Sequence, residues 1–163
     1  EATGRVLAAA RRAGIPVFFT TGASDPADPP NPGEAKLPAP SRAGVPQGDL
    51  MELDPRLGRR PAEKVLPKPY ASAFKGTNFH EMLSALRVDT LIVTGCSTSH
   101  CVYATCRDAK DSLRVIVPRE AVGERCELLH RVNLLDIEID LADVLPVDEV
   151  VAHLEGRQTL TDP

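Results

Sequence analysis

The sequence of 163 residues contains no tryptophan and few aromatic residues of any kind, which together make up 4% of the chain. Surfaces that bind single-stranded nucleic acid stack the bases on aromatic side chains. Nucleic-acid and anionic membrane surfaces also attract proteins with an excess of positive charge, whereas this chain has a formal net charge of −4. We therefore expect neither nucleic acid nor a membrane as its partner.

The sequence also lacks the patterns that mark membrane, secreted and metal-binding proteins. No apolar run approaches the roughly 18 residues that a membrane span requires, and no signal peptide is visible at the start of the chain. The four histidines form no H-x-H or H-x₃-H pair, the four cysteines no C-x-x-C pair, and neither a P-loop nor a G-x-G-x-x-G motif occurs. We expect a cytoplasmic protein with free thiols and without a metal or an organic cofactor.

What the chain does have is a regular alternation of strand-like and helix-like apolar patterns. This alternation has the spacing of β-α-β units, which predicts a parallel sheet covered on both faces. The predicted fold is α/β, a three-layer α/β/α Rossmann-like sheet in a single domain over residues 1–163. Residues 22–46, with seven of the fifteen prolines, are predicted to form a long loop. We predict strands at 15–21, 63–66, 89–95, 113–117 and, at an edge, 137–144, and helices at 2–13, 78–86, 99–112, 124–135 and 147–154.

One cysteine is placed where such a sheet carries its active site, at the carboxyl end of a strand. Cys101 lies in the first turn of a predicted helix, where free backbone N–H groups and the helix dipole stabilise a thiolate. Cys96, directly after the strand, is the alternative nucleophile. A buried, inert thiol is the non-functional alternative for Cys101. Cys106 and Cys126 are predicted to pack in the core.

Two kinds of basic residue are further candidates for the site. Lys68 stands between two prolines after a short predicted strand, so its backbone is stiffly held; the alternative is a solvated loop lysine. Arg119 and Arg125 follow another strand end, where an arginine could clamp a substrate carboxylate. From the residues alone, surface ion pairs with Glu120 or Glu124 are favoured for these arginines.

Two segments in the same order resemble motifs of one known family. The first is Lys68–Asn78, which fits the pattern K-x₃-S-A-F-x-G-T, and the second is Thr94–Thr105, with the sequence TGCSTSHCVYAT. Both are similar to the isochorismatase-like cysteine hydrolases, and the similarity extends over almost the whole chain. Residues 133–144 look most like the branch of N-carbamoylsarcosine and maleamate amidohydrolases. The resemblance implies the same α/β/α fold.

The resemblance implies a Cys–Lys–Asp catalytic triad. Cys101 matches the nucleophile and Lys68 the lysine of the triad. The family's aspartate ends its first strand, whereas this chain opens within the following helix, so no residue of this sequence matches that acid. We therefore expect the domain to lack its N-terminal first strand here.

The resemblance also implies how a substrate is held. A cis peptide bond between Cys96 and Ser97 would aim the N–H of Ser97, together with that of Cys101, at a developing oxyanion. Arg125 matches the arginine that binds the substrate carboxylate, and Thr98 is expected to contact the substrate. One departure is that the segment before the predicted strand 113–117 is one residue shorter than in the family.

The expected function is hydrolysis of the C–N bond of a small carboxylate-bearing amide or N-carbamoyl compound. The reaction would pass through a thioester or carbamoyl-enzyme intermediate on Cys101. The resemblance also implies a homo-oligomer, a dimer or tetramer. The alternative is the same fold acting as a non-catalytic oligomeric interaction subunit. Isochorismatases that cleave a vinyl ether use no cysteine nucleophile, so Cys101 argues against that chemistry.

Overall fold

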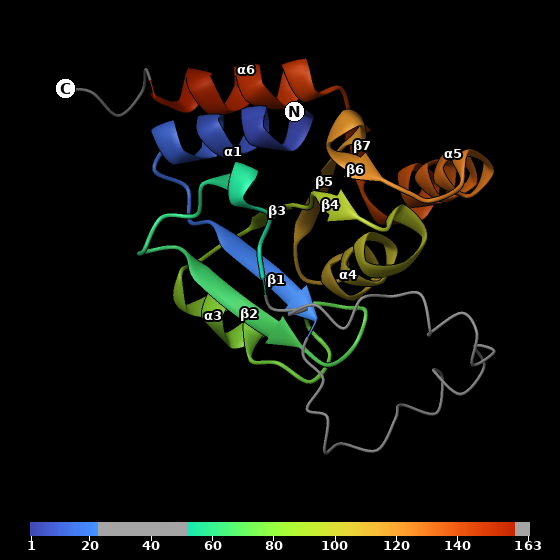
Figure 1. Ribbon diagram of the computed structural model, residues 1–163, viewed down its shortest axis with the longest axis horizontal. Coiled ribbons are helices and arrows are strands. Elements are labelled where there is room, and N and C mark those ends of the chain that lie inside the picture. Colours follow the sequence, from blue (N-terminus) through green and yellow to red (C-terminus); the bar gives the residue numbers. More distant parts are fainter. Residues whose placement is uncertain (23–51, 159–163) are drawn as a thin grey trace.

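The computed structural model describes residues 1–22 and 52–158, so the predicted loop 22–46 lies almost wholly outside the described residues. Strands occupy the middle of the molecule in Figure 1, with helices on both sides. Helices α1 (Ala2–Arg12) and α6 (Val147–Gln158) pack side by side over one face. Helices α3 (Phe79–Ala85) and α4 (Tyr103–Ala109) belong to the clusters on the other face. The predicted three-layer α/β/α fold is confirmed.

All of the strand pairs in the described residues are parallel, and they form three hydrogen-bonded groups. Strand β1 pairs with β2, strand β5 lies between β3 and β7, and the short strand β4 pairs with β6. Parallel strands present their carboxyl ends at one edge, and this edge positions the candidate site. The strands are β1 (Phe18–Gly22), β2 (Lys64–Lys68), β3 (Thr90–Ile92), β4 (Gly95–Cys96), β5 (Arg114–Pro118), β6 (Val122–Gly123) and β7 (Asp143–Leu145).

Strand β5 shows why helices cover both faces of the sheet. Val115 and Val117 belong to the cluster that contains Val93 and the buried Cys106 of α4. Ile116 belongs to the opposite cluster, which α1 and α6 build. Because successive side chains of a strand point to opposite faces, this continuous apolar run is buried on both sides, as expected for a parallel sheet.

The predicted edge strand 137–144 is wrong over most of its length. A π-helical turn, Ile137–Leu141, instead continues helix α5 (Glu127–Asp136), and only β7 is extended. The alternating pattern I-E-I-D-L also places apolar residues four positions apart. The first and last residues of the turn are buried, whereas Ile139 between them is exposed. A helical face therefore provides the burial that the alternation had suggested for a strand.

Other elements differ from their predicted bounds in ways that shape the site. The predicted strand 89–95 is divided into β3 and β4, and the predicted helix 99–112 begins with a π-helical turn, Thr98–Val102, before α4. Strand β2 extends as far as Lys68, beyond the predicted end at residue 66. Among the described residues, no helix is long and apolar enough to cross a membrane.

Candidate active site

The sequence-predicted nucleophile and lysine are brought together at the carboxyl edge of the strands. Lys68 is the last residue of β2, and its Nζ lies 3.4 Å from Sγ of Cys101. The same Nζ donates to the carbonyl oxygens of Tyr70, at 3.0 Å, and Ala71, at 2.9 Å. An ammonium group has three N–H donors, so all three have an acceptor here. These three contacts hold the largely buried charge at the sulfur.

The loop after β2 is built to present those two carbonyl groups. Thr105 of α4 accepts a hydrogen bond from the backbone N–H of Ala73 through its Oγ1, at 3.1 Å. The hydroxyl of Thr77 in turn donates to the carbonyl of Ala73, at 2.5 Å. Gly76 has a positive φ of 72°, and a Cβ there would lie 3.2 Å from the ring of Tyr70. Gly76 and Thr77 of the first motif, together with Thr105 of the second, therefore have structural roles in fixing the lysine's acceptors.

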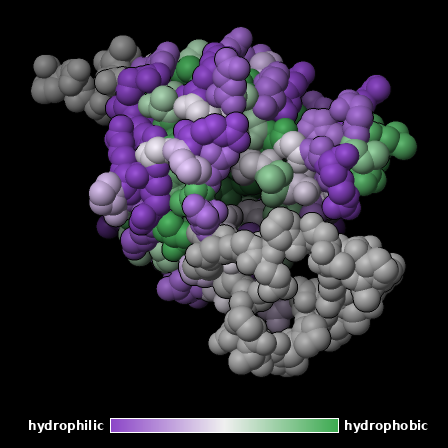
Figure 2. Space-filling model, viewed as in Figure 1, coloured by the Kyte–Doolittle hydropathy of each residue, from purple (hydrophilic) through white to green (hydrophobic). Residues whose placement is uncertain are grey.

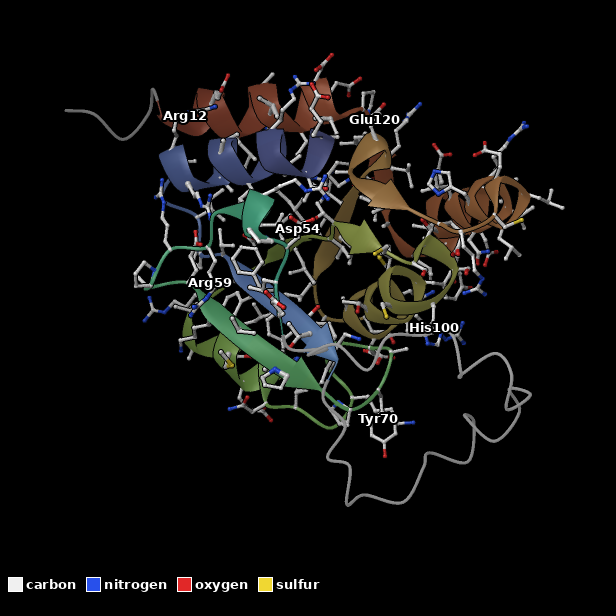
Figure 3. All side chains as sticks on the ribbon, viewed as in Figure 1. Arg12, Asp54, Arg59, Tyr70, His100 and Glu120 are labelled. Atoms are coloured by element: carbon white, nitrogen blue, oxygen red, sulfur yellow. The ribbon has the colours of Figure 1, made fainter. Side chains whose placement is uncertain are left out.

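Cys101 lies in the π-helical turn, not in a regular α-helix. The carbonyl oxygen of Ser97 accepts from the backbone N–H groups of both His100, at 3.0 Å, and Val102, at 3.1 Å. The peptide bond between Cys96 and Ser97 is cis, as the resemblance implied. Figure 3 shows the labelled His100 close to this helical segment and Tyr70 near the end of β2, so both flank the same edge of the sheet.

Glu124, for which the sequence predicts only an ion pair with Arg125, is a residue of the site. Its carboxylate accepts from the backbone N–H and the hydroxyl of Ser99, and from the backbone N–H of Arg125. Hydrogen bonding from Ser99 lowers the pKa of Glu124 to about 2. Its side chain has no exposed surface. The two contacting segments are 25 residues apart, so no local spacing could have revealed this cap on the helical segment of the nucleophile.

The two predicted arginines have different surroundings. Arg125 follows this buried carboxylate, but its own side chain is 75% exposed, and its Nε lies 4.0 Å from Glu124 Oε1. The guanidinium is thus open to solvent beside the nucleophile segment. Arg119 instead donates to the carbonyl of Val144, at 3.4 Å, and Glu120 accepts from the backbone N–H of Val147 at the start of α6. Neither Arg119 nor Glu120 belongs to the contacts around Cys101.

Thr98 is fully buried in the structure. Its Oγ1 donates to the carbonyl of Gly123, at 3.1 Å, and lies 2.9 Å from Nδ1 of His130 on α5. Both contacts join the nucleophile segment to β6 and α5. A direct contact between Thr98 and a substrate stays a prediction, and the geometry gives this residue a positioning role.

The four cysteines are all free thiols, as predicted, and they occupy different environments. Cys106 is completely buried, and burial raises the pKa of its thiol to about 12, which fits the predicted core role. Cys126 is exposed before α5, so its predicted core role is wrong. The alternative nucleophile Cys96 is also exposed. Among the described contacts, Cys101 is the thiol that lies within hydrogen-bond distance of a lysine.

The described residues contain no group of three His, Cys, Asp or Glu side chains that could hold a metal ion.

Comparison with known proteins gives concordant matches. The isochorismatase domain model matches residues 1–149. The chain is 35% identical to an N-carbamoylsarcosine amidase of an Arthrobacter species, over 98% of this chain and 65% of that protein. It is 43% identical to a maleamate amidohydrolase of Pseudomonas putida, over 56% of this chain and 44% of that protein. The chain thus spans less than two thirds of the length of either relative.

A solved structure agrees with these matches. The pyrazinamidase/nicotinamidase from Streptococcus mutans UA159 superposes with a TM-score of 0.74 at 25% sequence identity. The superposition covers 88% of this chain and 83% of that structure. The α/β/α architecture is therefore shared over most of both chains.

Proposed function

We propose, since the chain belongs to the isochorismatase family, that it is a cysteine-dependent amidohydrolase. Its substrate would be a small amide or N-carbamoyl compound that carries a carboxylate. The observation that carries the proposal is the buried ammonium of Lys68, 3.4 Å from Cys101 Sγ. A neighbouring positive charge favours the thiolate form of cysteine, which is the nucleophile. The names of the two amidase relatives support the type of bond that is cleaved.

Cys101 would begin the reaction by attack of its sulfur on the carbonyl carbon of the substrate. A carbon–sulfur bond forms, and the carbonyl oxygen becomes an oxyanion. We assign the stabilisation of this oxyanion to the backbone N–H groups of Ser97 and Cys101. When the tetrahedral intermediate collapses, the C–N bond breaks and the amine or ammonia leaves with a proton. Water then attacks the resulting acyl- or carbamoyl-enzyme, and the carbon–sulfur bond breaks.

Both steps require a group that moves protons between the thiol, the leaving nitrogen and water. The resemblance assigns this role to an aspartate at the end of a strand that no residue of this sequence matches. Lys68 is the only side chain in the described residues with a hydrogen bond to Cys101 Sγ. Its role is electrostatic, because its three donors hold the positive charge in place beside the thiolate.

Arg125 is our candidate for the group that holds the substrate carboxylate. Its guanidinium is mostly exposed and has only a loose ion pair with Glu124, so its donors remain able to bind a second carboxylate bidentately. The buried Glu124 accepts from the backbone N–H groups of both Ser99 and Arg125. One carboxylate therefore ties the base of this arginine to the nucleophile segment.

We further propose that the protein works in the cytoplasm, which the four free thiols support.

The first experiment separates nucleophile reactivity from turnover. Ammonia release is measured from N-carbamoylsarcosine, maleamate and nicotinamide with the full-length protein and its Cys101→Ala variant, and we expect turnover of one substrate that disappears in the variant. In parallel, iodoacetamide labelling followed by peptide mass spectrometry compares Cys101 with the exposed Cys126 in the same molecule. Lys68→Met should slow the labelling of Cys101 about tenfold or more, because an opposite charge at this distance is removed.

The exposed Lys64 at the start of the same strand supplies the matched control, since Lys64→Met should leave the labelling of Cys101 unchanged. Labelling of Cys101 no faster than that of Cys126, with no turnover of any substrate, would overturn the enzymatic proposal. It would favour the non-catalytic interaction subunit. Fast labelling without turnover of these three compounds would retain the nucleophile and reject the substrate class.

A further inference from the structure

Helix α5 contacts the nucleophile segment, residues 97–102, through the side chain of His130. In Figure 1 this helix lies at one side of the molecule, and Figure 2 shows that the surface at that edge mixes hydrophobic and hydrophilic residues. His130 is instead half-buried, and its Nδ1 lies 2.9 Å from Oγ1 of the fully buried Thr98. The proposed mechanism uses no imidazole, so this contact has no role in it so far.

The hydrogen bonds around Thr98 determine which nitrogen of His130 carries a hydrogen. A threonine hydroxyl has one hydrogen to donate. The carbonyl oxygen of Gly123, 3.1 Å from Thr98 Oγ1, can only accept, so the hydroxyl hydrogen is used there. Thr98 Oγ1 is therefore the acceptor in its contact with His130, and Nδ1 is the donor. A neutral histidine that donates from Nδ1 has no hydrogen on Nε2.

This pair of hydrogen bonds completes the attachment of Ser97 to strand β6. On one side of Ser97, Cys96 pairs with Gly123 in the parallel ladder between β4 and β6. On the other side, the hydroxyl of Thr98 donates to the carbonyl of the same glycine. Ser97 is thus held at both ends by one residue of β6. Its backbone N–H is assigned to the oxyanion, and the direction of that N–H depends on both attachments.

We propose that His130 is a positioning residue for oxyanion stabilisation, as an Nδ1–H donor that fixes the hydroxyl of Thr98 on Gly123. The inference rests on the proposed function, since the oxyanion belongs to that reaction. Without the imidazole, the buried Oγ1 of Thr98 loses one of its two hydrogen-bond partners. A buried polar atom that loses a partner is destabilised in its position, so the peptide groups beside it are held less firmly.

The nucleophile itself is held by other contacts. Glu124 accepts from the backbone N–H and the hydroxyl of Ser99, and Lys68 lies beside Cys101 Sγ. Neither contact involves the imidazole. Its loss therefore weakens oxyanion stabilisation and leaves the reactivity of the sulfur unchanged. The two effects can be measured separately, because iodoacetamide loses iodide from a saturated carbon when a thiolate attacks it, and no oxyanion forms.

Steady-state kinetics of the full-length protein, beside iodoacetamide labelling of Cys101, test the positioning role. For the amide that the wild type turns over, we expect His130→Leu to lower kcat about tenfold, within the range for small displacements of reacting groups. The labelling rate should stay that of the wild type. His130→Asn should recover most of kcat, since its amide can donate from the place of Nδ1. Arg131→Leu, at the exposed next position of α5, is the matched control and should change neither quantity.

A double-mutant cycle tests the route through the threonine. Thr98→Val keeps the volume of the side chain, removes the hydroxyl and should lower kcat by a factor similar to that of His130→Leu. In the Thr98→Val background, His130→Leu should have little further effect on kcat, because both substitutions remove the same contact. Two losses that multiply in the double variant would overturn the proposed route.

NMR of the wild type tests the donor assignment without any substitution. Long-range ¹H–¹⁵N correlations of the imidazole rings show which nitrogen of each neutral ring carries the hydrogen. In alkaline solution, where an ordinary histidine is neutral, we expect the Nδ1–H tautomer for His130. Its signals are those that disappear in His130→Asn, and the exposed His80 and His153 give reference signals in the same spectrum.

The outcomes distinguish this proposal from the proposed function. The positioning role would be overturned by an Nε2–H tautomer of His130 or by a kcat that His130→Leu leaves unchanged. Equal losses of kcat and of Cys101 labelling would also overturn it, because they would indicate a general structural role. Absence of turnover by the wild type would instead reject the proposed function, and with it the oxyanion role, before any variant is made.

Discussion

At the scale of single residues, Glu124 shows how a buried charge can organise a site without touching the reacting atoms. Its carboxylate accepts both the backbone N–H and the hydroxyl of Ser99, two positions before Cys101. Anions are stabilised near the first turn of a helical segment, where backbone donors lack partners. Since the side chain is completely enclosed, solvent does not replace these bonds readily when the carboxylate is lost.

We predict that Glu124→Ala lowers kcat by roughly 10- to 100-fold, the range for small displacements of catalytic groups. Glu124→Gln, which keeps one acceptor oxygen, should recover part of this loss. Glu120→Ala is the control, because Glu120 caps the neighbouring helix α6 through Val147. It should lower the thermal midpoint without lowering kcat. Steady-state kinetics and thermal scans of the three variants measure both effects, and equal losses of kcat in the two alanine variants would contradict a positioning role for Glu124.

The residues that carry the proposed chemistry were predictable because they lie in short motifs next to strand ends. Lys68 and Cys101 were both named from the sequence, and the structure brings them together. Glu124, and the contact between Thr98 and His130, could not be predicted in the same way. Each joins segments 25 to 32 residues apart. Such pairings depend on how the elements pack and have no local sequence pattern.

At the scale of elements, the segment after α5 shows the limit of periodicity. The alternation in residues 137–141 has the period of a strand, but Ile137 and Leu141 also fit one face of a helix. The buried and exposed sides of the segment distinguish the two readings. A strand would place Ile137 and Ile139 on the same face, whereas the structure buries Ile137 completely and leaves Ile139 73% exposed.

This difference predicts unequal effects of two otherwise similar substitutions. Ile137→Ala should lower the free energy of unfolding by about 2–5 kcal/mol, because it leaves a cavity in the core. Ile139→Ala should change it by less than about 0.5 kcal/mol, as expected at an exposed position. Urea titrations of both variants measure the two values. Similar losses in both variants would favour the strand that the sequence suggested.

At the scale of the whole molecule, the layered fold and the family were the most predictable features. The apolar runs of a parallel sheet and the two motifs reinforce one another over most of the chain, and the domain match over residues 1–149 confirms the family. Element boundaries were less predictable because the sheet's short strands, such as β4 and β6, have two residues each. Their pairing depends on the neighbouring strand and not on local propensity.

Buried ionisable groups also give the whole molecule a defined pH range of stability. Hydrogen bonds from Arg11 lower the pKa of Glu63 to about 2, and those from Ser99 lower the pKa of Glu124 to about 2, against an ordinary value of 4.5. Their contribution to the free energy of unfolding is complete above pH 4.5 and is lost as the pH falls towards 2, because the unfolded chain then binds protons that the folded chain does not.

Burial raises the pKa of Cys106 from 9 to about 12. The unfolded thiol therefore ionises first, and stability falls as the pH rises above 9.

We thus predict a plateau in the free energy of unfolding between about pH 5 and pH 9 with a decline on each side. Urea midpoints measured from pH 2 to pH 11 test it. The double variant Glu63→Gln/Glu124→Gln should flatten the acid decline, and Cys106→Ala should reduce the alkaline decline, which approaches about 1.4 kcal/mol per pH unit for one proton. Each variant serves as the control for the other. The double glutamine variant should leave the alkaline decline unchanged, and Cys106→Ala should leave the acid decline unchanged. An acid limb that is unchanged in the double variant would contradict this prediction. Glu63 and Glu124 would then have the same pKa in the folded and unfolded chains, and other carboxylates would dominate the acid response.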